Sequence, residues 1–351
     1  MTSNNFALTT LSQNPEYFEE VIQLIEEGFH YSELHHYEKD FAPLVDPMNF
    51  ENCYLYIDAE TSKVAAHLAV CIRTLIQDNC EMKVALIGGI VTNKDHRNRG
   101  LFKNLMEHVL SVYREQASLF ILWSDLEGIY EKFYFYRTGG MIETGKRNFS
   151  SSERPGGYEK TRFPALSEKD FENIINLYNN FNEKKFFTVK RDEKDWSILK
   201  EMNSIDLYIK KNNSGEIIRY FCVNKGRDLT NIIHEISCLD QSEYLLMLKE
   251  LEGYKIWLPE TELDKINSTE IYYTAFMKIG NLTMLNNFLT EISNNRLLLK
   301  EVNNEAVIFE FKTKTYEVSP KDFLQHLFGP NPLEEFAPYA LSLYIPGADS
   351  I

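Results

Sequence analysis

An apolar strand that leads into a basic turn and then into a helix constrains the fold of this chain more than any other feature. Residues 83–91 read as a buried strand, and the turn after them carries Arg97, Arg99 and Gly100. Leu101 then opens a stretch with apolar residues at helical spacing. A helix start offers free amides and the positive end of the dipole, glycine allows close backbone approach, and arginines add charge-assisted donors. The pattern therefore predicts a site for a pyrophosphate.

A second strand at 119–123 and an element Tyr-x-Lys-x-x-Phe that begins at Tyr130 follow the helix. In this order the elements resemble the acetyl-CoA-binding core of the GNAT (Gcn5-related N-acetyltransferase) superfamily. Residues 97–100 fit the Gln/Arg-x-x-Gly start of that family's loop, whereas Phe102 stands where the family has a small residue. The alternative interpretation is an ordinary βαβ unit with a basic helix cap, although a helix start does not favour arginine.

The resemblance implies how the chain would hold acetyl-CoA, its expected co-substrate, without a metal ion. In GNAT enzymes, amides at the end of the strand before the loop polarise the thioester carbonyl, and the loop and helix start hold the pyrophosphate. The cofactor-binding residues implied here are Ile90, Val91, Thr92, Arg97, Asn98, Arg99, Gly100, Leu101, Phe102 and Lys103. Tyr130 corresponds to the tyrosine that in many of these enzymes protonates the departing thiolate, which a phenol with a pKa of about 10 can do. Packing on the coenzyme or under the sheet is the other role open to Tyr130.

The order of elements in the first half of the chain recurs in the second half. Strand-like residues 55–57 and 64–70 are matched by 207–209 and 217–223, at a near-constant offset of about 150 residues. A further strand and a helix at 241–250 follow in the same order. The pattern indicates a tandem repeat, and chance similarity among common strand residues is the alternative.

The second copy lacks the phosphate loop, because Asp240 and Glu243 stand in its place and carboxylates repel phosphate. We therefore expect an α/β fold with a mixed sheet, built from two tandem GNAT-like units and a small C-terminal α+β segment. Residues 1–150 would bind acetyl-CoA, residues 151–267 would form the degenerate unit, and residues 268–351 would pack on the body. The plan is similar to that of the bacterial Eis-type acetyltransferases, which carry two GNAT units followed by a C-terminal domain.

The general base for the acceptor amine is left open. Many GNAT enzymes use a glutamate on the strand before the loop, but residues 83–91 contain no acid. Asp125, Glu127 and water molecules are candidates. In Eis-type enzymes the C-terminal carboxylate lies near the acceptor, so the resemblance adds the carboxylate of Ile351.

Composition and charge limit the partners. No run of 18 apolar residues occurs and the N-terminus lacks the blocks of a secretory signal, so we expect no membrane association. The five cysteines have no C-x-x-C spacing, which predicts buried free thiols and a cytoplasmic protein. A net charge of −15 disfavours a nucleic-acid partner and favours a cationic amine.

The segment 29–37 is rich in aromatic residues and histidine. In GNAT proteins the segment that joins the first two helices lies beside the acceptor pocket, so we expect substrate contacts here. His35 and His36 have no third ligand at a suitable spacing nearby, which favours loop packing over a metal site.

Together these observations predict an acyltransferase that moves an acetyl group from acetyl-CoA to a primary amine by direct attack in a ternary complex. The acceptor would be a small-molecule or peptide amine, and neither its identity nor the oligomeric state follows from the residues. The alternative is a non-catalytic acyl-CoA-binding sensor or interaction module with a degenerate tandem GNAT fold. A Fem-type aminoacyl-tRNA-dependent transferase is disfavoured, because those tandem GNAT proteins lack a phosphate loop and need a basic surface for tRNA.

Overall fold

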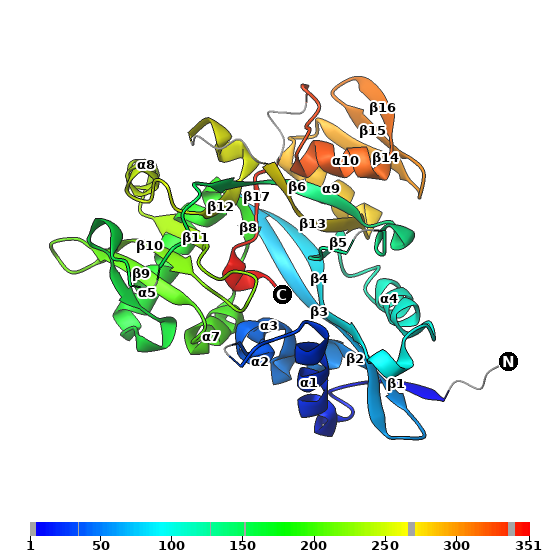
Figure 1. The fold of residues 1–351 in the computed structure, drawn as a ribbon. Coiled ribbons are helices and arrows are strands. Elements are labelled where there is room, and N and C mark those ends of the chain that lie inside the picture. The colour runs from blue at the N-terminus through cyan, green and yellow to red at the C-terminus, as the bar shows by residue number, and fades with distance from the viewer. Residues whose placement is uncertain (1–4, 34, 127, 151, 266–270, 336–340) are drawn as a thin grey trace.

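The computed structural model describes residues 5–33, 35–126, 128–150, 152–265, 271–335 and 341–351 (Figure 1). Two α/β halves share one large sheet, and a small C-terminal unit packs against it. The C-terminus lies in the middle of the molecule, beside β3 and β4 (Figure 1).

The first half contains the predicted strands and helices in the predicted order. Its main elements are β1 (Phe6–Thr10), α1 (Phe18–Gly28), α2 (Tyr37–Asp40), α3 (Ala42–Val45), β2 (Cys53–Asp58), β3 (Lys63–Gln77), β4 (Cys80–Thr92), α4 (Leu101–Val112), β5 (Leu119–Leu122) and β6 (Tyr136–Thr144). Strands β1 to β4 pair antiparallel in chain order, and β5 lies parallel to β4. A helix between two parallel strands is the connection that such a pair requires.

The second half repeats this topology, which confirms the tandem fold. Its main elements are β7 (Glu159–Thr161), α5 (Glu168–Leu177), α6 (Glu183–Lys185), β8 (Phe187–Val189), α7 (Glu193–Glu201), β9 (Asp206–Lys211), β10 (Ile217–Val223), β11 (Ile233–Cys238), α8 (Gln241–Glu250), β12 (Ile256–Pro259) and β13 (Ile271–Ile279). Strands β9, β10 and β11 pair antiparallel and β12 lies parallel to β11, with α8 as the crossover, as β2 to β5 and α4 are arranged in the first half.

The two halves exchange a strand. β13 from the second half pairs with β5, whereas β6 from the first half pairs with β12, and β6 and β13 pair with each other. Met277, for example, lies opposite Ile121 on one side and Tyr136 on the other. The exchange joins both halves into one 14-stranded sheet. The predicted boundary between residues 267 and 268 falls shortly before β13, and the insertion of β13 between β5 and β6 was not predicted from the sequence.

The C-terminal unit combines two helices with a separate three-stranded sheet. Its elements are α9 (Leu282–Ile292), β14 (Leu297–Val302), β15 (Val307–Phe311), β16 (Lys314–Val318) and α10 (Pro320–Phe328). The chain then returns to the main sheet as β17 (Leu343–Tyr344), which pairs with β8, and ends in a short turn at Gly347–Asp349.

Two apolar clusters cover opposite faces of the first half of the sheet. Val84 and Leu86 of β4 face the cluster that includes helices α1 to α3, and their neighbours Ala85 and Ile87 face the cluster beneath α4. All five cysteines are free, and four of them are buried, as predicted. None of the helices in the described ranges combines the length and the apolar character needed to cross a bilayer.

Candidate active site

Strands β4 and β5 separate at the end that precedes the basic loop. Their pairing runs from Val84 opposite Leu119 to Ile87 opposite Leu122 and then stops. β4 continues to Thr92, and on this stretch its only partner among the described strands is β3. Backbone groups of residues 88–92 on the β5 side are therefore left without a strand, at the place predicted for the amides of Ile90, Val91 and Thr92.

A buried histidine holds the backbone at this opening. The β3–β4 register shifts between His67 and Ala69, and Gly89 has a φ of 59°, in the left-handed region that favours glycine. The Nδ1 of His67 lies 2.7 Å from the Gly89 carbonyl oxygen, so Nδ1 carries the proton and donates it. Burial lowers the pKa of His67 to about 4, which keeps the ring neutral at pH 7. His67 was not among the residues predicted from the sequence, although a histidine within an apolar strand needs a partner.

The basic loop ends in a helix start without a side-chain cap. Gly100 precedes α4 with a φ of 80°, and a Cβ at this position would meet no atom within 4 Å, so the space beside it is open. The first turn of α4 contains no acid, and among the described residues no acceptor is found for the amides of Leu101, Phe102 and Lys103. Arg97, Asn98 and Arg99 are exposed beside them.

Charged side chains near the helix start have few competing partners. The Arg99 guanidinium lies 5.7 Å from the centre of the Phe6 ring. Lys103 forms an exposed ion pair with Glu107, with 3.6 Å between Nζ and Oε1, and such pairs are weak in water. The positive charge at the start of α4 is therefore largely unneutralised.

Phe102 and Tyr130 pack against each other on the α4 face of the sheet. Their ring centres are 6.1 Å apart in an edge-to-face arrangement, and Phe102 also lies 5.5 Å from Phe133. The phenylalanine in place of a small residue therefore packs in an aromatic cluster. The same cluster contains Ile87 and Leu122, the last paired residues of β4 and β5.

Tyr130 is buried in this cluster, against Phe135 and Phe276 as well as Phe102. Burial raises the pKa of Tyr130, and a hydrogen bond with Ser124 offsets part of the rise. The phenol therefore stays protonated near neutral pH, which is the state that can donate a proton.

The C-terminal carboxyl group lies on the other face of the same opening. A Cβ on Gly88, the first β4 residue beyond the paired stretch, would lie 3.3 Å from the carboxyl carbon of Ile351 and 2.9 Å from Leu44 Cδ2. Only a glycine leaves this space. Asp125 is exposed in the loop after β5, and Glu127 lies outside the described residues. Of the predicted base candidates that are described, Ile351 is the one in contact with β4.

Aromatic side chains line the Ile351 face beside the opening. Gly28 ends α1 against Val91, and the segment after it places the Tyr37 hydroxyl 3.3 Å from the Cβ position of Gly89. The Tyr37 ring stacks on Phe41 at 4.9 Å and meets Tyr31 at 5.9 Å.

Carboxylates surround this aromatic group. Burial raises the pKa of Tyr31, and the negative charges of Asp40, Asp228 and Glu26 raise it further. The positive charge of Arg227 offsets part of this rise, and the three acids together leave the region favourable for a cation.

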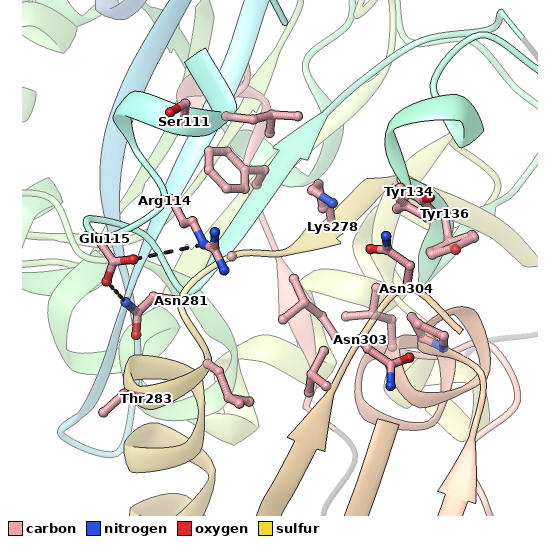
Figure 2. A pocket seen from close by; sticks show the side chains of 18 residues that line it. Ser111, Arg114, Glu115, Tyr134, Tyr136, Lys278, Asn281, Thr283, Asn303 and Asn304 are labelled. Carbon is pink, nitrogen blue, oxygen red and sulfur yellow. Dashed lines mark hydrogen bonds and ion pairs between the residues drawn. The ribbon is translucent and has the colours of Figure 1, made fainter. Parts of the chain in front are cut away.

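Two cavities lie away from the opening. One, of about 610 Å³, lies at the other end of β5, where Arg114 and Lys278 point toward its centre (Figure 2). The second, of about 320 Å³, lies between α2 and the second half and is lined by His35, Asp40 and Asp206 among others. Neither cavity includes a predicted cofactor-binding residue. Within the described ranges, no group of three or more His, Cys, Asp or Glu side chains could hold a metal ion.

Comparison with known proteins identifies the fold. Residues 11–137 match the family model of the acetyltransferase (GNAT) domain. A GCN5-related N-acetyltransferase from Anabaena variabilis is similar in structure, with 13% identity, a TM-score of 0.60, and coverage of 99% of this chain and 100% of that one. A search of curated proteins gave no match.

Two further structures have the tandem plan. Eis1 from Mycobacterium abscessus matches with 10% identity and a TM-score of 0.58, over 99% of this chain and 98% of that one. Saccharomyces cerevisiae N-myristoyltransferase with bound myristoyl-CoA matches with 10% identity and a TM-score of 0.54, over 79% of this chain and 83% of that one. The chain therefore has the fold of the GNAT acyltransferases, with residues 11–137 as a GNAT domain. More particularly, its fold has the tandem plan and is similar over nearly the whole chain to that of Eis1.

Proposed function

We propose that this protein transfers an acetyl group from acetyl-CoA to a primary amine within a ternary complex. One observation carries the proposal: the apolar cluster that contains Tyr130 covers one face of the sheet where β4 and β5 separate, and the carboxyl group of Ile351 lies against Gly88 on the other face. An acid and a base on opposite faces of one opening suit a reaction in which one substrate loses a proton and the other gains one.

The residues around the opening fit acetyl-CoA as the first substrate. The unpaired edge of β4 offers backbone donors to an extended pantetheine arm and to the thioester carbonyl at Ile90, Val91 and Thr92. The uncapped start of α4, with Arg97 and Arg99 exposed beside it, suits the pyrophosphate. Asn98, Gly100, Leu101, Phe102 and Lys103 complete the loop and helix start, as the family resemblance implies.

The Ile351 carboxylate and Tyr130 take the two proton-transfer roles. The carboxylate accepts a proton from the acceptor ammonium, and the neutral amine forms the new C–N bond at the thioester carbonyl. The C–S bond breaks, and Tyr130 donates its phenolic proton to the departing thiolate. Asp40, Asp228 and Glu26 favour a cationic acceptor on the Ile351 face, and the free cysteines favour a reducing cytoplasm.

The test combines binding with turnover. Titration calorimetry with acetyl-CoA should give saturable binding. Thiol release should then depend on an added amine from a panel containing an aminoglycoside, a polyamine, a free amino acid and a peptide. Myristoyl-CoA in the same assay tests the length of the acyl chain. Binding without thiol release for every amine would instead identify the non-catalytic sensor.

Arg99→Glu tests the loop. The new carboxylate would lie beside the pyrophosphate, so we expect at least a tenfold weaker affinity for acetyl-CoA in calorimetry. Arg114→Glu, which makes the same change at an exposed arginine just after α4, is the control and should leave the affinity unchanged. Equal affinities for both variants would remove the loop from the proposed site.

A further inference from the structure

The last five residues of the chain are fixed by the second half of the molecule. Residues 347–349 are buried, and Ile351 is 9% exposed. Gly347 lies against His234 so closely that a Cβ would come within 2.5 Å of the imidazole ring. The tail therefore has a defined path to the opening between β4 and β5.

A buried arginine holds this tail through Asp349. Arg191 Nε lies 3.1 Å from both carboxylate oxygens of Asp349, and its Nη2 lies 2.8 Å from Oδ2. Arg191 also pairs with Glu235, at 3.0 Å from Nη1 and 2.5 Å from Nη2. The Arg191 and Glu235 side chains are fully buried, and that of Asp349 is 2% exposed.

Neighbouring side chains fix the arginine itself. Its guanidinium lies 3.9 Å from the ring centre of Tyr178 and 4.8 Å from that of Trp196. The Tyr220 hydroxyl donates to Glu235 over 2.7 Å. The guanidinium thus has little freedom to move, and neither has the carboxylate bound to it.

Lys225 holds the backbone on both sides of Asp349. Its Nζ donates to the Gly347 carbonyl over 2.7 Å and to the Ser350 carbonyl, one residue before the terminal carboxylate. Lys225 is fully buried, and Phe41 from the first half lies 4.8 Å from Nζ. The tail is therefore bound by side chain and by backbone within two residues of its end.

Buried charges of this number are not explained by stability. Replacing a buried ion pair with apolar residues is often neutral or stabilising, because desolvation offsets the attraction. The ion pairs of Arg191 do provide a fixed geometry. The segment that they fix is the C-terminal tail, which ends in the Ile351 carboxylate beside Gly88.

From this geometry we infer that the second GNAT-like unit, which lacks a phosphate loop, serves the reaction by positioning the C-terminal carboxylate. Arg191, Lys225 and Asp349 are positioning residues that act through Ile351. The inference rests on the proposed function, since it gives the carboxylate a reaction to serve.

The first test is Asp349→Asn, which keeps the shape of the side chain but removes the charge that Arg191 binds. We expect kcat to fall at least tenfold with acetyl-CoA and the best amine of the panel, while the acetyl-CoA Kd changes less than twofold. The matched control is Glu250→Gln, because Glu250 also pairs with a buried arginine of the second half, Arg219, at 3.2 Å. The control should retain kcat within twofold.

The second test adds one glycine after Ile351, which leaves the buried network in place but moves the carboxylate along the chain by one residue. We expect a similar loss of kcat with an unchanged acetyl-CoA Kd. In the glycine-extended chain, Asp349→Asn should cost less than a further threefold, because the carboxylate is already displaced. Circular dichroism at the assay temperature would establish that each variant is folded.

The outcomes separate the two proposals. Full activity of the glycine-extended chain would overturn the carboxylate as base, and with it the inference. A loss on extension combined with full activity of Asp349→Asn would overturn the positioning role alone. If the losses of kcat from the two changes multiply in the double variant, the positioning role would also be overturned. Independent effects would mean that Asp349 does not act through the Ile351 carboxylate.

Discussion

Tyr130 and Ile351 are held by different means, and the difference decides how each can be tested. The Tyr130 ring is enclosed by aromatic neighbours, so its packing does not depend on the hydroxyl. The Ile351 carboxylate belongs to the backbone, so its place depends on the path of the tail. A side-chain substitution can therefore probe the proposed acid, whereas the proposed base is probed through the tail.

Tyr130→Phe should lower turnover and leave binding almost unchanged. The ring packing remains, but the proton donor for the departing thiolate is lost, and general acid catalysis typically contributes about 10²-fold or more. Initial rates of thiol release against acetyl-CoA concentration would show a lower kcat at similar KM. Tyr134→Phe, at a tyrosine with 41% exposure, is the control. A variant that turns over as fast as the parent would leave Tyr130 with a packing role.

The buried His67 should make the protein less stable in acid. Its folded pKa of about 4 is below the usual value of 6.5, so between these pH values the unfolded chain binds more protons than the folded one. The free energy of unfolding should therefore fall as the pH falls from 6.5 to 4, by up to about 3 kcal/mol from this residue.

Urea unfolding at pH 7 and pH 4.5 would measure the fall. His67→Gln can still donate to the Gly89 carbonyl but does not titrate, so its loss of stability between the two pH values should be smaller than that of the parent. The exposed His36 offers the control, since His36→Gln should retain the parent's pH dependence. An unchanged dependence in His67→Gln would contradict the assignment.

At the scale of helices and strands, elements with a local sequence signal were predicted, whereas the pairing of strands that are distant in the chain was not. The helix predicted at about 241–250 is present as α8, because helix-forming residues and flanking breaks are local signals. The position of β13 in the sheet was not predicted, because its partners β5 and β6 lie more than a hundred residues earlier in the chain. Local sequence signals do not identify partners at that distance. Arg191 and Asp349 are 158 residues apart and were missed for the same reason.

The candidate site likewise has one part that a local motif predicts and one part that it does not. The basic loop and helix start follow from a local motif, and the structure places them where β4 ends. The Ile351 carboxylate was a candidate only through the family resemblance, since nothing in the terminal residues themselves indicates where they lie. The roles of the loop residues and of Tyr130 stay predictions until they are tested.

At the scale of the whole molecule, the exchange of β6 and β13 makes the two halves depend on each other. If β13 left the sheet, β5 and β6 would both lose a neighbour, and exposed strand edges are unfavourable. The tail adds a second connection, because it is bound by the second half and ends against β4 of the first. Neither half has a complete sheet alone, and the proposed site draws on both halves.

The halves should therefore unfold together, although a chain of this length commonly unfolds domain by domain. Trp123 lies directly after β5 in the first half, and Trp196 lies on α7 in the second. Two variants that each keep one of these tryptophans, with the others changed to phenylalanine, would report on each half by fluorescence during a urea titration. Coincident midpoints are expected, because strands on both sides of the exchange lose their partners in one step. Midpoints separated by about 1 M urea or more would mean that the halves are independent, and that the exchanged strands join them without coupling their stability.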